Sequence, residues 1–87
     1  MKDSTVKGRD FIGKVIVSDE TGKRFGRVGD VSFLPDSGEL MNLLLVEATR
    51  SAAEMQLQQD EKGRFLVPFS SVKSVGDFVI IAEKDVF

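Results

Sequence analysis

The chain has 87 residues, of which 41% are hydrophobic, 12 are Lys or Arg and 14 are Asp or Glu, and it contains neither cysteine nor histidine. A chain this short buries only about 60 to 65% of its unfolded surface, so it forms one domain with one modest core. Without cysteine or histidine it lacks disulfides, thiolate nucleophiles, the usual zinc and haem ligands and the commonest general base at neutral pH.

The charges are divided unevenly along the chain. Residues 1–28 hold seven basic groups against four acidic ones, a net charge of +3, whereas residues 29–87 hold five against ten, a net charge of −5. Ordinary surface scatter is one explanation, and a bipolar surface that meets two partners or stacks on itself is the other. The overall charge of −2 is far from the basic balance of phosphate-binding surfaces, so we expect no nucleic-acid partner.

The N-terminal ten residues are polar, and no window of about 18 consecutive apolar residues follows them. We therefore expect neither a signal peptide nor direct membrane insertion, and a cytoplasmic protein. Residues 1–10 are expected to form a flexible segment before an ordered domain that begins near Phe11.

Short β-rich runs separated by turn residues follow in chain order, as in a small barrel or sandwich. The first predicted strand covers residues 14–18, and residues 19–22 form a turn. The second runs over residues 24–34 but is interrupted by Gly26 and Gly29, which predict bulges or bends. We expect Gly26 to lie where the sheet curls.

Residues 40–47, the third predicted strand, are the most apolar stretch of the chain and follow a turn at residues 35–38. Both faces of this strand are largely apolar, whereas a strand that covers one core alternates with polar residues. The second face therefore needs a cover, which is either the chain's own loop or C-terminus, or a second copy in a dimer.

Residues 48–62 are ambiguous. Residues 51–54 fit a capping box at the start of a helix, while residues 55–58 alternate as a strand does. We favour a short strand, because the turn signal at residues 60–63 would close it as a hairpin with residues 64–67. One helical turn over residues 69–72 and a last strand over residues 78–83 complete a six-stranded prediction.

No catalytic motif is present. Residues 26–29 are not a phosphate-binding loop followed by a helix, and no nucleophile has a neighbouring base. The acidic pairs at residues 19–20 and 60–61 lie in turns and do not match the spacing of a calcium loop. We expect no enzyme activity, no metal and no cofactor.

The ordered motifs resemble the PRC-barrel domain over about residues 9 to 83. The resemblance is carried by residues 11–17, 21–23, 25–31, 35–38, 65–69 with Val72 and Val75, and 78–81. Its structural positions are Gly13, Gly22, Gly26, Gly38 and Pro68. It implies an all-β fold, a small six-stranded PRC-type β-barrel with one short helical turn, covering residues 11–83 and followed by a tail at residues 84–87.

Among PRC-barrel proteins the chain is most similar to free-standing archaeal members. That resemblance implies a non-catalytic protein–protein adaptor in archaeal cell division, one that links the membrane anchor of the tubulin-like division ring to other division proteins. Such an adaptor would be recruited from the cytoplasm to mid-cell. The alternative is a ribosome-maturation or RNA-associated module.

We also expect a homodimer, because apolar side chains on the third strand and in the tail exceed what a small monomer exposes. The expected interface residues are Leu44, Val46, Val86 and Phe87.

Overall fold

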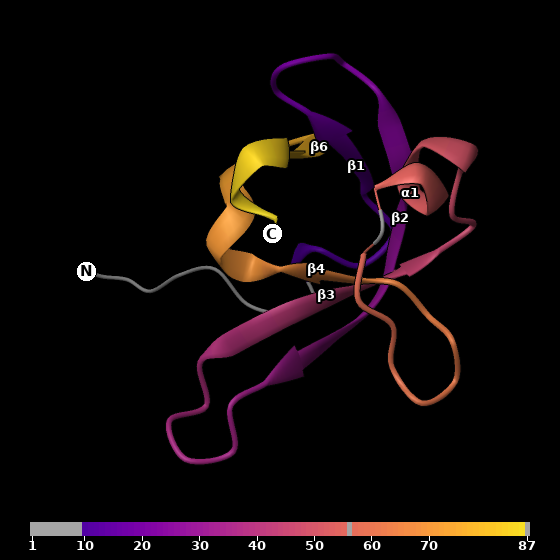
Figure 1. Ribbon diagram of the computed structural model, residues 1–87. Coiled ribbons are helices and arrows are strands. Elements are labelled where there is room, and N and C mark those ends of the chain that lie inside the picture. Colours follow the sequence, from indigo (N-terminus) through magenta and orange to yellow (C-terminus); the bar gives the residue numbers. More distant parts are fainter. Residues whose placement is uncertain (1–9, 56, 87) are drawn as a thin grey trace.

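Residues 10–55 and 57–86 are described by a computed structural model, which is drawn in Figure 1. Short helical segments connect or follow the strands, and none of those in this part of the chain is long and apolar enough to cross a membrane. The strands are β1 (Val15–Ser18), β2 (Arg24–Phe33), β3 (Leu40–Val46), β4 (Leu66–Pro68), β5 (Val72–Val75) and β6 (Phe78–Ile81). The helical segments are α1 (Arg50–Glu54) and the 3-10 turns η2 (Phe69–Ser71) and η3 (Glu83–Asp85).

The six strands form one sheet in the order β4-β3-β2-β1-β6-β5. Neighbouring strands are antiparallel except for β1 and β6, which are parallel. The two edge strands, β4 and β5, are consecutive in the chain and are joined only by η2. The expected six-stranded all-β architecture is confirmed, although among residues 10–55 and 57–86 no strand pairing closes the sheet into a continuous ring.

The strand predicted for residues 55–58 is wrong. Helix α1 occupies the preceding residues, and the extended segment after it contributes one isolated bridge, between Gln59 and Phe65. The helix begins because the Thr49 side chain accepts a hydrogen bond from the Ala52 amide, two residues before the capping box read from the sequence. The Thr49 hydroxyl also donates to the Arg24 carbonyl at 2.6 Å, a long-range contact that no local pattern reveals.

Strand β5 was not predicted from the sequence, whereas the helical turn before it was. The turn ends at Ser71, and the next four residues pair with β6. Val72 and Val75 pack against the core, while the two residues between them are exposed. The stretch therefore lacks the strict alternation that marks a strand in sequence.

Two glycines in β2 let the sheet curl. Gly26 has φ +139, and a Cβ there would lie 2.9 Å from the Val46 carbonyl oxygen. The chain after β3 crosses at this point, and the Thr49 amide donates to the Phe25 carbonyl at 3.1 Å. Gly29 is the extra residue of a β-bulge between Val28 and Asp30, where the register with β3 shifts.

The core lies on the concave side of this sheet. Phe11 is fully buried just before β1, and its ring contacts Phe69 of η2 edge to face, with ring centroids 5.8 Å apart. Helix α1 contributes Ala52, and β1, β2, β3, β4 and β6 contribute the other main members. The strand residues of the cluster are Ile16, Phe25, Val28, Leu43, Leu45, Val67, Val79 and Ile81.

The second apolar face of β3 is covered mostly by the chain itself. Leu44 is only 6% exposed within the single chain, whereas Val46 is 40% exposed. The expectation that Leu44 presents an exposed surface is therefore wrong.

Candidate interaction surface

The outer end of the β2–β3 hairpin projects away from the rest of the sheet (Figure 1). We call residues 30–41 the β2–β3 arm. Its tip is the predicted turn, in which the Gly38 amide donates to the Leu34 carbonyl at 2.9 Å and the Leu34 amide donates to the Glu39 carbonyl at 2.8 Å. Gly38 has φ +75, which a residue with a side chain adopts only at a cost.

The arm exposes three large apolar side chains at its outer end. Phe33 is 47% exposed, Met41 40% and Leu34 39%. Val31, nearer the body, and Leu40, opposite Phe33, are partly buried against the core. The arm thus contacts the core through these two side chains, while Phe33, Leu34 and Met41 remain partly exposed to water.

The arm also carries acidic charge without compensation from its own sequence. Asp30, Asp36 and Glu39 are exposed. No Lys or Arg occurs between Val28 and Val46. The projecting surface is therefore apolar and acidic.

One edge of the arm is already occupied by a side chain. Strand β1 pairs with β2 only as far as Val15 opposite Arg27, and no other strand of the described chain lies beside the outer half of β2 on that side. There the Val31 amide donates to the Asp30 carboxylate at 2.8 Å. Such a contact blunts an edge that would otherwise invite a further strand.

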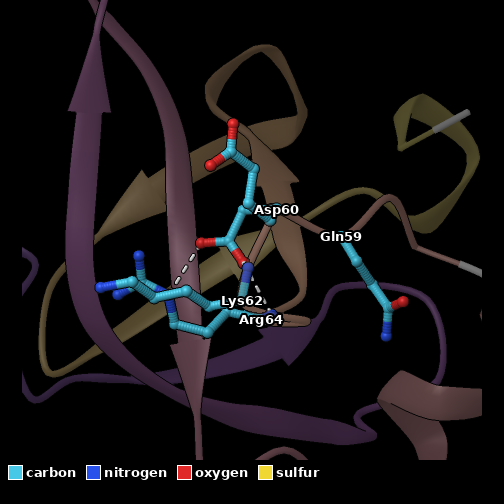
Figure 2. Close-up of a pocket in the computed structure, with 5 residues that line it drawn as sticks. Gln59, Asp60, Lys62 and Arg64 are labelled. Atoms are coloured by element: carbon cyan, nitrogen blue, oxygen red, sulfur yellow. Dashed lines mark hydrogen bonds and ion pairs between the residues drawn. The ribbon is translucent and has the colours of Figure 1, made fainter.

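A second feature is an open hollow of about 410 Å³ at the turn after Gln59, lined by Gln59, Asp60, Glu61, Lys62 and Arg64. Figure 2 shows Asp60 bonded to its neighbours while Gln59 points away. One Asp60 oxygen accepts from the amides of Lys62 and Arg64, at 3.0 and 2.8 Å, and the other from the Arg64 guanidinium at 2.8 Å.

These bonds determine the protonation of Asp60. Partial burial raises the pKa of its carboxyl, but the hydrogen bonds from the Arg64 amide, the Arg64 side chain and the Lys62 amide outweigh this, so the pKa lies below its ordinary value. The carboxylate is thus committed to holding its own turn. The hollow lies at the hairpin turn, and the Asp60 and Arg64 side chains that line it are bonded to each other.

A smaller hollow of about 170 Å³ lies where β2 crosses the end of β3, lined by Val15, Arg24, Gly26, Arg27, Glu47 and Thr49. Arg27 donates to the Gly13 carbonyl at 3.0 Å and lies 3.7 Å from the Glu47 carboxylate. Both side chains are more than half exposed, so this ion pair adds little to stability.

The β1–β2 turn is tied to the C-terminal part of the chain. Thr21 donates to the Glu83 carboxylate at 2.7 Å, and Lys73 donates to the Asp19 carboxylate at 2.9 Å. Hydrogen bonds from Ser18 and Thr21 lower the pKa of Glu83, and the hydrogen bond to Asp19 raises the pKa of Lys73. In residues 10–55 and 57–86, no three acidic side chains are grouped so that they could hold a metal ion.

The interface residues expected from the sequence do not come together as one exposed patch. Leu44 is buried, Val46 is exposed beside Gly29, and Val86 is partly buried against the core. Phe87 lies outside the described residues, as do residues 1–9 of the expected flexible segment. Their role in binding a partner stays a prediction.

The glycines and the proline expected to be structural, by contrast, each lie where the backbone conformation explains the residue type. Gly13, Gly22, Gly26 and Gly38 all have positive φ. Pro68, which ends β4, is opposite Asn42 on an edge strand, where the missing amide is tolerated.

Phe33, Leu34 and Met41 were missed as a possible surface. The signal that could have found them is the presence of apolar residues on both sides of the turn at residues 35–38, because the solvent-exposed end of a hairpin is usually polar.

A strongly curved six-stranded sheet, a helical turn between its edges and a projecting hairpin together define a small barrel-type β domain. Residues 3–86 match the sequence model of the PRC-barrel domain, so the chain belongs to the PRC-barrel family. No curated protein matches the chain. Membership of this family indicates a small interaction module of the adaptor type.

Proposed function

We propose that this PRC-barrel protein is a non-catalytic adaptor in archaeal cell division, which links the membrane anchor of the tubulin-like division ring to other division proteins. The observation that supports an adaptor best is the β2–β3 arm, which exposes Phe33, Leu34 and Met41 on a rigid sheet. Exposed apolar side chains gathered in one place on a small domain mark a surface for binding other proteins.

The absence of catalysis is part of the proposal. The sequence supplies no cysteine or histidine. Three carboxylates are held by neighbouring side chains, with Asp60 bonded to Arg64, Asp19 to Lys73 and Glu83 to Thr21. Each of these contacts stabilises the domain rather than preparing a reacting group.

The division role rests on the resemblance to free-standing archaeal PRC-barrel proteins, and localisation tests it. A fluorescent fusion expressed in the native host should form bands at mid-cell that coincide with the division ring. The matched control is the fluorescent protein alone, which should fill the cytoplasm. Diffuse or ribosome-coincident signal through the whole cell cycle would contradict the division role.

A ribosome-maturation or RNA-associated role is the second candidate, favoured only by the basic N-terminal third of the sequence. It would require a basic face with stacking aromatic residues. We expect only weak non-specific binding to ribosomal RNA, in the range of about 10⁻⁴ to 10⁻⁶ M at physiological salt. An affinity clearly tighter than about 1 μM would favour the RNA role instead.

We further propose that the protein forms a two-fold homodimer. Val46 and the C-terminal residues Val86 and Phe87 remain the candidates for its interface, whereas Leu44→Asp would disturb a buried position. Light scattering on the wild type, on Val46→Asp and on a chain cut after Asp85 tests this. A monomeric wild type rejects the dimer, and a dimer that persists in both variants has its interface elsewhere.

A further inference from the structure

We propose that the β2–β3 arm binds a partner protein through a short segment that combines Lys or Arg with apolar side chains. This inference rests on the proposed adaptor function and adds the chemistry of the partner. The proposed occupant is a basic segment of another protein, which lies across the exposed side chains of the arm.

The first argument is the grouping of apolar surface. Exposed apolar side chains also occur outside the arm, such as Ile12 before β1 and Phe78 at the start of β6. Single exposed apolar residues are ordinary on a protein surface. Phe33 and Leu34 are adjacent, and Met41 follows Leu40, which is opposite Phe33, so these three occupy neighbouring positions at the outer end of one hairpin.

The second argument is charge. The arm holds Asp30, Asp36 and Glu39, all exposed, and its own sequence supplies no base. A segment with Lys or Arg beside its apolar residues would complement both properties at once. Two arms packed against each other would instead bring like charges together, which argues against a second copy bound arm to arm.

The third argument concerns how the segment binds. Because the Asp30 carboxylate holds the Val31 amide at 2.8 Å, the free edge of β2 is not open to a new strand unless this contact breaks. The face of the arm has no such obstacle. We therefore assign binding to side-chain contacts on the face of the arm, anchored by Phe33, rather than to strand addition at its edge.

The test uses the full chain and a short fluorescein-labelled peptide in which Leu and Lys are separated by Ser, measured by fluorescence anisotropy. Two control peptides replace Lys by Glu or Leu by Ser. Both controls should bind at least about tenfold more weakly, because each removes one of the two complementary properties. Equal binding of all three peptides would overturn the assignment.

A matched pair of variants locates the site. Phe33→Ser removes the main anchor of the arm, while Phe78→Ser removes a phenylalanine of nearly equal exposure, 44% against 47%, outside it. We expect about a tenfold or greater loss of peptide affinity for Phe33→Ser and less than about a twofold change for Phe78→Ser. Equal losses, or a loss only for Phe78→Ser, would contradict the proposal. Thermal unfolding of both variants verifies that each is folded.

A second pair separates the local charge from the net charge. Glu39→Lys reverses a charge on the arm, and Glu61→Lys makes the same change at an exposed position in another turn. Only Glu39→Lys should weaken the Lys-containing peptide, by several-fold at low salt, with the difference shrinking as salt screens the charges. An equal effect of both variants would mean that the peptide responds only to overall charge, and would overturn the proposal.

Two further results would assign a different occupant to the arm. If Phe33→Ser abolishes self-association in light scattering, the occupant is a second copy. If a chain lacking residues 2–9 binds the peptide far more tightly than the full chain, the occupant is the chain's own basic N-terminal segment. Either result overturns the assignment to a partner protein.

The localisation experiment keeps this inference distinct from the proposed function. A wild-type fusion at mid-cell together with a diffuse Phe33→Ser fusion supports both. Mid-cell bands for both fusions retain the division role but reject the arm as its contact. A diffuse wild-type fusion rejects the division role, and the peptide measurements then decide on the arm alone.

Discussion

The two ends of the β2–β3 hairpin differ in how well they tolerate amino-acid substitution. At its base, Gly26 and Gly29 lie against the residues that end β3, and a single added methyl group at either position would meet atoms closer than ordinary contact. At its outer end, Phe33, Leu34 and Met41 extend into water. The base therefore determines whether the sheet can curl, and the outer end is free to serve binding.

Among the glycine variants, the largest effect should come from Gly26→Val. The new side chain would meet the Val46 carbonyl oxygen, which is backbone and cannot rotate away, and the φ of +139 strains any β-branched residue. We expect a loss of at least about 3 kcal/mol, or a melting temperature lower by roughly 12 °C or more. Calorimetry of the variant and of the wild type measures this difference in stability.

The control for Gly26→Val is Gly38→Ala in the arm. Gly38 also has a positive φ, but nothing lies within 4 Å of an added Cβ. It should cost only about 1 to 2 kcal/mol, the strain of the backbone conformation by itself. Equal losses at the two positions would mean that crowding at the base contributes nothing.

A smaller effect, and a rescue, are expected at Gly29. An added Cβ there would lie 2.3 Å from Cγ1 of Val46, a side-chain atom. Gly29→Ala should cost about 1 to 3 kcal/mol, and combining it with Val46→Ala should recover at least about 1 kcal/mol of that loss.

The same second substitution should not rescue Gly26→Ala, because Val46→Ala leaves the obstructing carbonyl in place. Urea denaturation of the singles and doubles gives both coupling energies. Similar coupling for the two glycines would contradict the distinction between backbone and side-chain crowding.

Ser32, midway along the outer part of β2, should give a gain of about 1 kcal/mol on substitution. Its hydroxyl oxygen is buried and has no hydrogen-bond partner among the described residues. Ser32→Ala removes an unsatisfied polar group, whereas Ser74→Ala, at an exposed position in β5, should change little. A clear loss for Ser32→Ala in thermal unfolding would indicate that the hydroxyl has a partner in solution.

The smallest change in stability is expected for Phe33→Ser, within about 0.5 kcal/mol of the wild type, because nearly half of this residue is exposed and it lies outside the buried core. The contrasting variant is Phe25→Ala at the base, where a fully buried ring should cost about 3 to 5 kcal/mol. If Phe33→Ser unfolds as easily as Phe25→Ala does, the arm is part of the packed body and the contrast between the two ends fails.

Local signals in the sequence predicted much of this fold. The turn at residues 35–38, the hairpin turn after Gln59 and the bend at Gly26 each depend on a few neighbouring residues whose conformational preferences are strong. Strand β5 and the start of α1 were not predicted correctly, because they depend on contacts with β6 and with the Arg24 carbonyl, far away in the chain.

The candidate surface was harder to predict than the fold. The sequence drew attention to β3, where both faces are apolar, but Leu44 is buried within the single chain. Burial of a strand's second face depends on how far the sheet curls, which strand-by-strand reasoning does not supply. The apolar residues beside the turn carried the more useful signal, because a hairpin end cannot be covered by its own strands.

The parallel pairing of β1 with β6 has a consequence for the order in which the chain folds. Residues 15–18 are opposite residues 78–81, so the central part of the sheet joins segments that are far apart in sequence. The β2–β3 hairpin needs only local contacts and can form in microseconds, whereas pairing with β6 requires closing a long loop. During synthesis, β1 therefore has one unpaired edge until the last strand emerges. In that interval the nascent chain is open to mispairing with a neighbouring copy, and β6 is the segment that ends the exposure.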